Sequence, residues 1–240
     1  MTEAVFREDA YARDCTAKVV SVNDRGGIIL DRTVFYASGG GQPGDAGTLE
    51  FDGRTCAIAT TVYDQDRKTI VHVPKEPEQV PDVGQELTVV LDWATRHKYM
   101  RVHTALHLLC SVINYPVTGG QIGAGDGRLD FDIQDAGAIE KEAVEAQLNE
   151  IIAGDHAVSE TWISDAELEA NPGLVRTMSV KPPMGSGHVR LVSIGEGGSV
   201  DLQPCGGTHV KSTAEIGRVA IPKVEKKGRQ NRRVRLALSE

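Results

Sequence analysis

The sequence, 240 residues long, lacks several features that would place it in a common class. No stretch approaches the ~18 consecutive apolar residues of a membrane span, so we expect no membrane insertion. The N-terminal segment MTEAVFREDAYARD is charged and has no apolar core typical of a secretion signal. The four cysteines are widely spaced and form no CxxC pair, which favours free thiols in a reducing, cytoplasmic compartment.

Two familiar catalytic signatures are also missing. In the segment HTALH, Thr104 occupies the position at which zinc peptidases of the HExxH type carry their general base, so peptidase activity is not expected. The glycine-rich segment FYASGGGQPGDAG, residues 35–47, has no following Lys-Ser/Thr pair, so it is not a P-loop and we expect no nucleotide cofactor. On the residues alone, this segment is interpreted as a turn within a β-barrel.

The charge of the chain is unevenly distributed. The net charge is −8, which argues against non-specific nucleic-acid binding by the whole surface. Residues 218–235 nevertheless contain eight Lys or Arg and one Glu, a local charge of +7, so the remainder carries −15. This segment is either a local anion-binding site or a solvated, charged edge strand.

Hydrophobic patterning divides the chain into two parts. Between residues 16 and 92, short runs rich in Val, Ile and Thr alternate with Gly, Pro and Asp turns, which predicts a small β-barrel domain over residues 1–92. Residues 93–115 contain neither Gly nor Pro and have helical periodicity, with Asp92 as N-cap. Further helices are predicted over 138–154 and after the capping box at 164–167, with strands between them. Residues 93–240 are therefore predicted to form an α+β domain.

Two short motifs in the second part contain residues that bind soft metals. His103 and His107 are four residues apart on the predicted helix and share one face, while Cys205 and His209 flank a glycine pair in PCGGTHV. Each pair alone is weak, and a histidine pair on a helix surface is common. Together they supply a ligand set suited to one zinc ion. Whether that zinc is structural or catalytic stays open from the residues, and ester hydrolysis is the chemistry we consider most suitable.

Several motifs, in this order, carry a family resemblance. They are FYASGGGQPGDAG, RVHTALHLL, GGQIG, RLDFDI, VRLVSIG, PCGGTHV, EIG and KKGRQNRRVRLAL. The chain resembles the editing domain of alanyl-tRNA synthetase and, more closely, the freestanding AlaX-type editing proteins. The resemblance covers most of the chain. It implies an N-terminal β-barrel followed by an α+β editing domain similar to that of threonyl- and alanyl-tRNA synthetases. It also implies that His103, His107, Cys205 and His209 bind zinc.

The activity implied by the resemblance is hydrolysis of the ester between tRNA(Ala) and a wrong amino acid. Serine would be the chief substrate and glycine a poorer one, while alanine would be spared. Thr104, Gln121 and Gln42 are candidates for reading the serine hydroxyl. The resemblance places Gly39, Gly40 and Gly41 close to the substrate, and Arg232 and Arg233 are expected to contact acceptor-stem phosphates.

Two other functions remain open at this point. The chain could edit another mischarged tRNA, of the threonine or proline system, or be a non-catalytic, zinc-stabilised RNA-binding module. Zinc could activate a water molecule or position the substrate.

Overall fold

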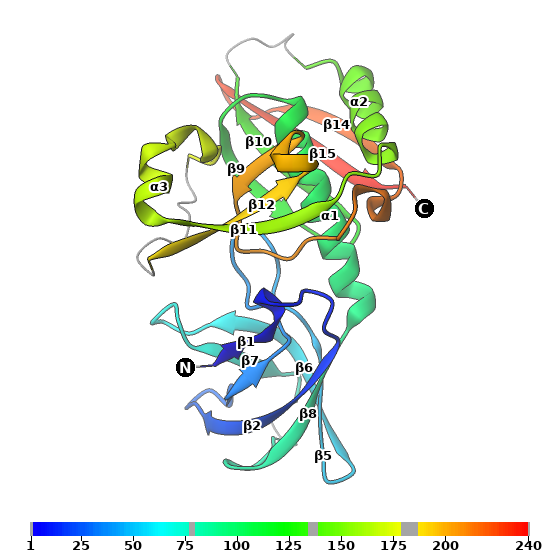
Figure 1. Cartoon of the computed structure of the whole chain (residues 1–240). Helices are drawn as coiled ribbons and strands as arrows, with labels where there is room; N and C mark the ends of the chain where they lie inside the picture. Colours follow the sequence, from blue (N-terminus) through cyan, green and yellow to red (C-terminus); the bar gives the residue numbers. More distant parts are fainter. Residues whose placement is uncertain (1, 77–79, 134–138, 179–186, 240) are drawn as a thin grey trace. The chain divides into compact units, whose positions relative to one another are not determined.

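The computed structural model describes residues 2–76, 80–133, 139–178 and 187–239 (Figure 1). Contacts between Cα atoms divide the chain into two compact units, Met1–His97 and Lys98–Glu240, and each is described by itself. Within the described residues, no helix combines the length and hydropathy needed to cross a bilayer. The predicted fold class, a small barrel followed by an α+β domain, is confirmed.

The first unit is a closed six-stranded barrel. Going round the barrel, its strands are β2 (Asp14–Val22), β3 (Ile28–Leu30), β7 (Ile70–Pro74), β6 (Arg54–Tyr63), β5 (Gly47–Phe51) and β8 (Glu86–Leu91). Alternate residues of β2 and β8 are buried, so one face of each strand fills the barrel. A short parallel pair, β1 (Glu3–Ala4) with β4 (Arg32–Thr33), lies beside it.

A buried ion pair ties the glycine-rich segment to the start of the first helix. Arg96 is fully buried, and its Nε lies 3.0 and 2.9 Å from the two carboxylate oxygens of Asp45. The same guanidinium donates to the carbonyls of Ala10 and Val34, and Asp45 also accepts the Tyr36 backbone N–H. All these groups belong to the first unit, so the pair fixes the end of residues 35–47 within it.

The barrel encloses a histidine that folding keeps neutral. His72 is fully buried, with Nδ1 3.1 Å from the Ile28 carbonyl and Nε2 2.8 Å from the Thr33 hydroxyl. Burial lowers the pKa of His72 to about 4. In the unfolded chain, His72 binds a proton with an ordinary pKa of about 6.5. The contribution of neutral, buried His72 to the free energy of unfolding is therefore fully present above that pH and is lost as the pH falls toward 4.

We therefore predict that acidification from pH 6.5 to 4 costs the barrel up to about 3 kcal/mol through His72. Hydrogen exchange of barrel amides against pH measures this slope. His72→Gln should flatten it, whereas His188→Gln, which alters an exposed histidine, should leave it unchanged. An unaltered slope in the His72 variant would mean that other groups cause the acid sensitivity.

The second unit contains two antiparallel sheets. The four-stranded sheet has the order β14 (Val219–Lys226), β15 (Asn231–Leu238), β10 (Asp126–Asp132) and β9 (Val117–Ile122). The three-stranded sheet has the order β11 (Val158–Ser164), β12 (His188–Ile194) and β13 (Asp201–Pro204). Short 3₁₀ helices connect or flank elements at Val5–Arg7, Pro172–Leu174, Glu196–Gly198 and Thr213–Ile216.

Three α-helices complete the fold. Most of their predicted ends are confirmed, but the first helix ends at Val112, three residues before the end of the stretch predicted to be helical. Helix α1 (Trp93–Val112) begins at Asp92, whose carboxylate accepts the Thr95 backbone N–H at 3.2 Å, as expected for an N-cap. Helix α2 (Lys141–Ala153) ends at Gly154, as predicted, and buries an apolar stripe with a spacing of four residues; residue 138, where the prediction began, lies outside the described ranges. Helix α3 (Asp165–Ala170) starts with the predicted capping box.

Candidate metal centre

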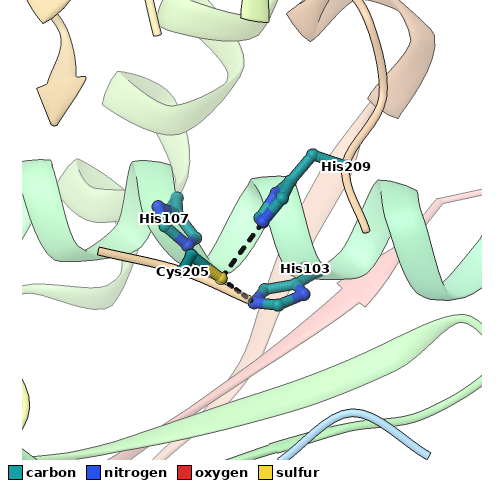
Figure 2. Close-up of side chains that lie close together, drawn as sticks. All are labelled: His103, His107, Cys205 and His209. Atoms are coloured by element: carbon teal, nitrogen blue, oxygen red, sulfur yellow. Dashed lines mark hydrogen bonds between the residues drawn. The ribbon is translucent and has the colours of Figure 1, made fainter. Parts of the chain in front are cut away.

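Four side chains that the sequence analysis singled out come together in the second unit. The ligand atoms of His103, His107, Cys205 and His209 all lie within 4.8 Å of one another. Cys205 Sγ is 3.4 Å from His103 Nε2 and 3.3 Å from His209 Nε2, and Figure 2 shows the side chains converging on a common point. The three histidines are buried, and Cys205 is partly exposed.

The separations match those of a tetrahedral zinc site. With Zn–S bonds of about 2.3 Å and Zn–N bonds of about 2.0 Å, tetrahedral geometry separates sulfur from nitrogen by about 3.5 Å. The distances from Cys205 Sγ to His103 Nε2 and His209 Nε2, 3.4 and 3.3 Å, are close to this value. One thiolate and three imidazoles are also donors of the type that zinc prefers. The residues present therefore fit a zinc ion.

Helix geometry and one tight loop bring the ligands together. His103 and His107 are one turn apart on α1, with ring centroids 5.4 Å apart. Cys205 directly follows β13, and its sulfur accepts the Gly207 backbone N–H at 3.4 Å, which folds the loop back toward His209. The small residues between the two ligands allow this close return of the backbone.

The Thr104 hydroxyl fixes the tautomer of His209. Thr104 is fully buried, and its hydroxyl donates to the Met100 carbonyl at 2.9 Å. That hydroxyl proton is then committed, so at a separation of 3.2 Å His209 Nδ1 must donate to Thr104 Oγ1. The Val210 backbone N–H also donates to this oxygen. Thr104 thus leaves His209 Nε2 unprotonated and directed at the metal position.

Asp201 and Gln203 play the corresponding part for His107. Asp201 Oδ2 lies 2.9 Å from His107 Nδ1, and Gln203 Nε2 donates to both oxygens of that carboxylate at 2.8 and 2.9 Å. Such a carboxylate orients a histidine ligand and raises its basicity. Neither residue was among the predicted site residues. Their signal is the alternation DLQPC, which places residues 201, 203 and 205 on one side of an extended strand.

Arg190 holds the loop that carries Cys205. One guanidinium nitrogen donates to the backbone carbonyls of Cys205 and Gly207, each at 2.8 Å. The other nitrogens form a bidentate ion pair with Glu160 on β11. Arg190 is only 6% exposed, and the other buried residues of its strand are uncharged. The sequence signal for this role is the single Arg in the run HVRLVSI, and Arg190 was not among the predicted site residues.

The cluster also shifts the pKa values of its own members. Burial opposes ionisation of Cys205, but the adjacent imidazoles of His103 and His209 prevail and lower the pKa of its thiol well below the ordinary value. Burial acts to lower the pKa of His107, yet hydrogen bonds to Asp201 and Cys205 raise it to about 10. Because ligation requires neutral imidazole, metal binding must release the His107 proton, and the affinity should therefore fall on acidification.

Removing the carboxylate behind His107 should weaken zinc binding. We predict that Asp201→Ala lowers zinc affinity about 10–100-fold, because the ring loses its orienting acceptor. Competition with a chromogenic chelator measures this affinity. Asp126→Ala removes an equal charge at an exposed position of β10 and should have no effect. Equal losses in both variants would assign the effect to net charge and not to this hydrogen bond.

The glycine-rich residues form a tight turn in the first unit. Gly39 and Gln42 exchange backbone hydrogen bonds of 3.1 and 2.9 Å, and the two residues between them have φ values of 57° and 85°. Positive φ at both central positions is the pattern of a type I′ turn, which favours glycine. The interpretation of this segment as a barrel turn therefore fits its backbone, and Gln42 itself is buried.

The remaining predicted site residues have contacts of their own in the second unit. Gln121 is exposed on β9 and accepts a hydrogen bond from Arg128 at 3.2 Å. Arg232 is 5% exposed, and both carboxylate oxygens of Asp130 bind Arg233, at 2.7 and 2.8 Å. Arg232 is thus buried and Arg233 is paired within the chain, and their expected contact with acceptor-stem phosphates stays a prediction.

Comparisons with known proteins show the family. The sequence model of the second additional domain of threonyl- and alanyl-tRNA synthetases matches residues 189–235, and that of the class II (A) tRNA synthetases matches residues 8–95. Alanyl-tRNA editing protein AlaX-M of Methanosarcina mazei is 34% identical over 246 residues, which cover 99% of this chain and 97% of that protein. This chain belongs to the AlaX family of alanyl-tRNA editing proteins.

Longer AlaX proteins and synthetases match only in part. Alanyl-tRNA editing protein AlaX-L of Pyrococcus horikoshii is 32% identical, and the match covers 95% of this chain and 56% of the relative. Alanine–tRNA ligase of Pyrobaculum arsenaticum is 36% identical over a match that covers 25% of the ligase. The resemblance inferred from the motifs is confirmed.

Proposed function

We propose that this protein is a zinc-dependent hydrolase acting in trans on mischarged tRNA(Ala). It cleaves the ester of Ser-tRNA(Ala) and, less well, of Gly-tRNA(Ala), and spares Ala-tRNA(Ala). The observation that carries the proposal is the convergence of three histidines and one cysteine, in a chain that aligns over its length with an alanyl-tRNA editing protein. The partner is the acceptor end of tRNA(Ala).

The surroundings of the cluster support a catalytic use of the metal. When bound, zinc would supply a Lewis acid able to polarise an ester carbonyl or to lower the pKa of a water molecule. The chain orients the site through His209 held by Thr104, His107 held by Asp201, and the Cys205 loop held by Arg190. Because Cys205 and the following glycine are not fully buried, the cluster is accessible at the loop.

Selectivity requires a polar group that reads the serine hydroxyl. A site built to bind a hydroxyl rejects the analogue without it by roughly 10⁴-fold. Gln42, Gln121 and Thr104 remain the proposed readers, with Gly39–Gly41 as substrate contacts. Because the Thr104 hydroxyl already has three partners in the protein, this residue would have to give up a contact in order to read the substrate.

One assay tests the proposal directly. Release of amino acid from Ser-, Gly- and Ala-tRNA(Ala) is measured side by side, with mischarged tRNA(Thr) and tRNA(Pro) as further substrates. Rapid release of serine with alanine retained supports the proposal, and release only from another tRNA would identify a different editor. The same assay on Gln42→Ala, Gln121→Ala and Thr104→Val shows which residue sets selectivity; unchanged ratios in all three would exclude them as readers.

Chelation separates a catalytic zinc from a structural one. A zinc that only stabilises an RNA-binding module should unfold the second unit when it is removed. A catalytic zinc should abolish release of serine while circular dichroism retains most of the folded signal.

The hairpin of β14 and β15 offers a test of phosphate binding. Lys226, Lys227 and Arg229 are exposed at its tip, unlike Arg232 and Arg233. Log affinity for tRNA falls as log salt concentration rises. We predict that replacing all three with glutamine makes this negative slope shallower by about 2 to 3. The matched control replaces Lys18, Arg54 and Lys68 of the barrel, which are also exposed. A slope equal to the wild-type value would mean that the tip is merely solvated.

A further inference from the structure

Three residues form a row across the three-stranded sheet. Trp162 on β11 lies directly opposite Arg190 on β12. On the other side of β12, the Cys205 backbone N–H donates to the Arg190 carbonyl at 3.1 Å, one residue beyond the pair Leu191–Pro204. Neighbouring strands are about 4.8 Å apart, so two spacings place the tryptophan backbone about 10 Å from that of the cysteine ligand. Figure 1 shows β11 and β12 side by side.

The row has its side chains on the face of the sheet that carries the metal cluster. Residues directly opposite in an antiparallel pair point to the same side, as do residues two apart on one strand. Asp201 and Gln203 point to the face of the sheet that is turned toward His107, because Asp201 is hydrogen-bonded to His107. They lie opposite Ile194 and Val192, which are on the same side of β12 as Arg190. Trp162 therefore shares this face.

Trp162 is unusually exposed for a large aromatic residue. Its relative exposure is 56%, and the neighbouring residues 159–161 of the edge strand are also exposed. Among the described residues, no aromatic ring packs against the Trp162 indole. The other tryptophan, Trp93, is instead stacked against His97, with ring centroids 5.3 Å apart. Packing against the described residues thus does not account for Trp162, whereas an external partner would.

We infer that Trp162 is a stacking platform for the nucleobase next to the scissile ester. This inference rests on the proposed function and identifies the part of the substrate that this face would bind. If the ester lies at the metal, the base of the terminal nucleoside lies one sugar away from it. This span is comparable with the separation of about 10 Å between the backbones of Trp162 and Cys205. Indole rings stack on bases without sequence preference. Trp162 pairs in the sheet with Arg190, and the guanidinium of Arg190 binds the Cys205 loop.

Fluorescence tests this stacking without any need for hydrolysis. In a Trp93→Phe background, Trp162 is the only tryptophan, because the chain has two. An oligonucleotide ending in CCA should quench its emission, and the same oligonucleotide with an abasic 3′ residue should quench it much less. Equal quenching by both, or none by either, would overturn the inference.

Kinetics provide the second arm. On Ser-tRNA(Ala), Trp162→Ala should raise KM about tenfold with a smaller change in kcat, and Trp162→Phe should restore most of the loss. Val20→Ala, at an equally exposed apolar residue, is the control and should match the wild type. Active variants with wild-type KM would overturn the inference and leave the proposed function standing. A wild-type protein that releases no amino acid would overturn the proposed function, and the quenching titration would still decide the role of Trp162.

Discussion

Replacing Cys205 with alanine is expected to reduce zinc affinity by more than about 100-fold and to abolish release of serine from Ser-tRNA(Ala). Replacing a residue that only orients a metal ligand lowers metal affinity about 10–100-fold, so removing the ligand itself should lower it more. The thiolate is also the charge that faces His103 and His209, at 3.4 and 3.3 Å. Metal content by atomic absorption and the deacylation assay measure the two effects.

Cys56→Ala is the matched control for this experiment. Cys56 is a buried free thiol on β6 of the barrel, in the first unit, and burial raises the pKa of its thiol, so it is a poor ligand. Its replacement should leave zinc content unchanged. Full zinc content and activity in Cys205→Ala would contradict the assignment of the metal centre.

Replacing Asp45 with alanine should destabilise the barrel by about 3–5 kcal/mol. The substitution leaves the guanidinium of Arg96, which is 0% exposed, without its counterion, and an uncompensated buried charge is strongly unfavourable. The Tyr36 N–H would also lose its acceptor. Hydrogen exchange of barrel amides reports the free energy of unfolding of this unit.

Two further variants separate the buried pair from ordinary surface charge. Glu3→Ala breaks an exposed pair with Arg32, whose side chain is 43% exposed, and should change stability by less than about 1 kcal/mol. Asp45→Leu combined with Arg96→Met removes both charges and should recover most of the loss. If Asp45→Ala were as mild as Glu3→Ala, the pair would not be needed for the stability of the barrel.

Local signals predicted much of the fold. The Val/Ile/Thr runs located β2, β3, β6, β7 and β8, and the N-cap Asp92 located the start of α1. Strand β5 was missed because Gly47 follows directly on a glycine-rich turn and its partners, β6 and β8, come later in the chain. Strand order round the barrel depends on such non-local pairings, which short sequence patterns do not encode.

In the candidate site too, local sequence patterns predicted some residues, and residues that depend on long-range contacts were missed. Spacing alone selected the two histidines of α1 and the pair that flanks the glycines, because each pair is local. The residue that orients His107 is remote: Asp201 reaches it across 94 positions. In the barrel, Arg96 likewise reaches Asp45 across 51 positions. Arg96 was missed because it lies in a polar stretch of the helix, where a charged side chain is usually solvated, and only the tertiary fold buries it.

The metal ligands have a consequence for the order in which the molecule matures. During synthesis His103 leaves the ribosome 102 residues before Cys205, so the nascent helix presents a two-nitrogen half-site long before the sulfur exists. Closing so long a loop is entropically costly, and the cation would offset part of that cost once the last ligands arrive. Capture of the ion would then be a late event, coupled to the docking of the Cys205 loop on α1.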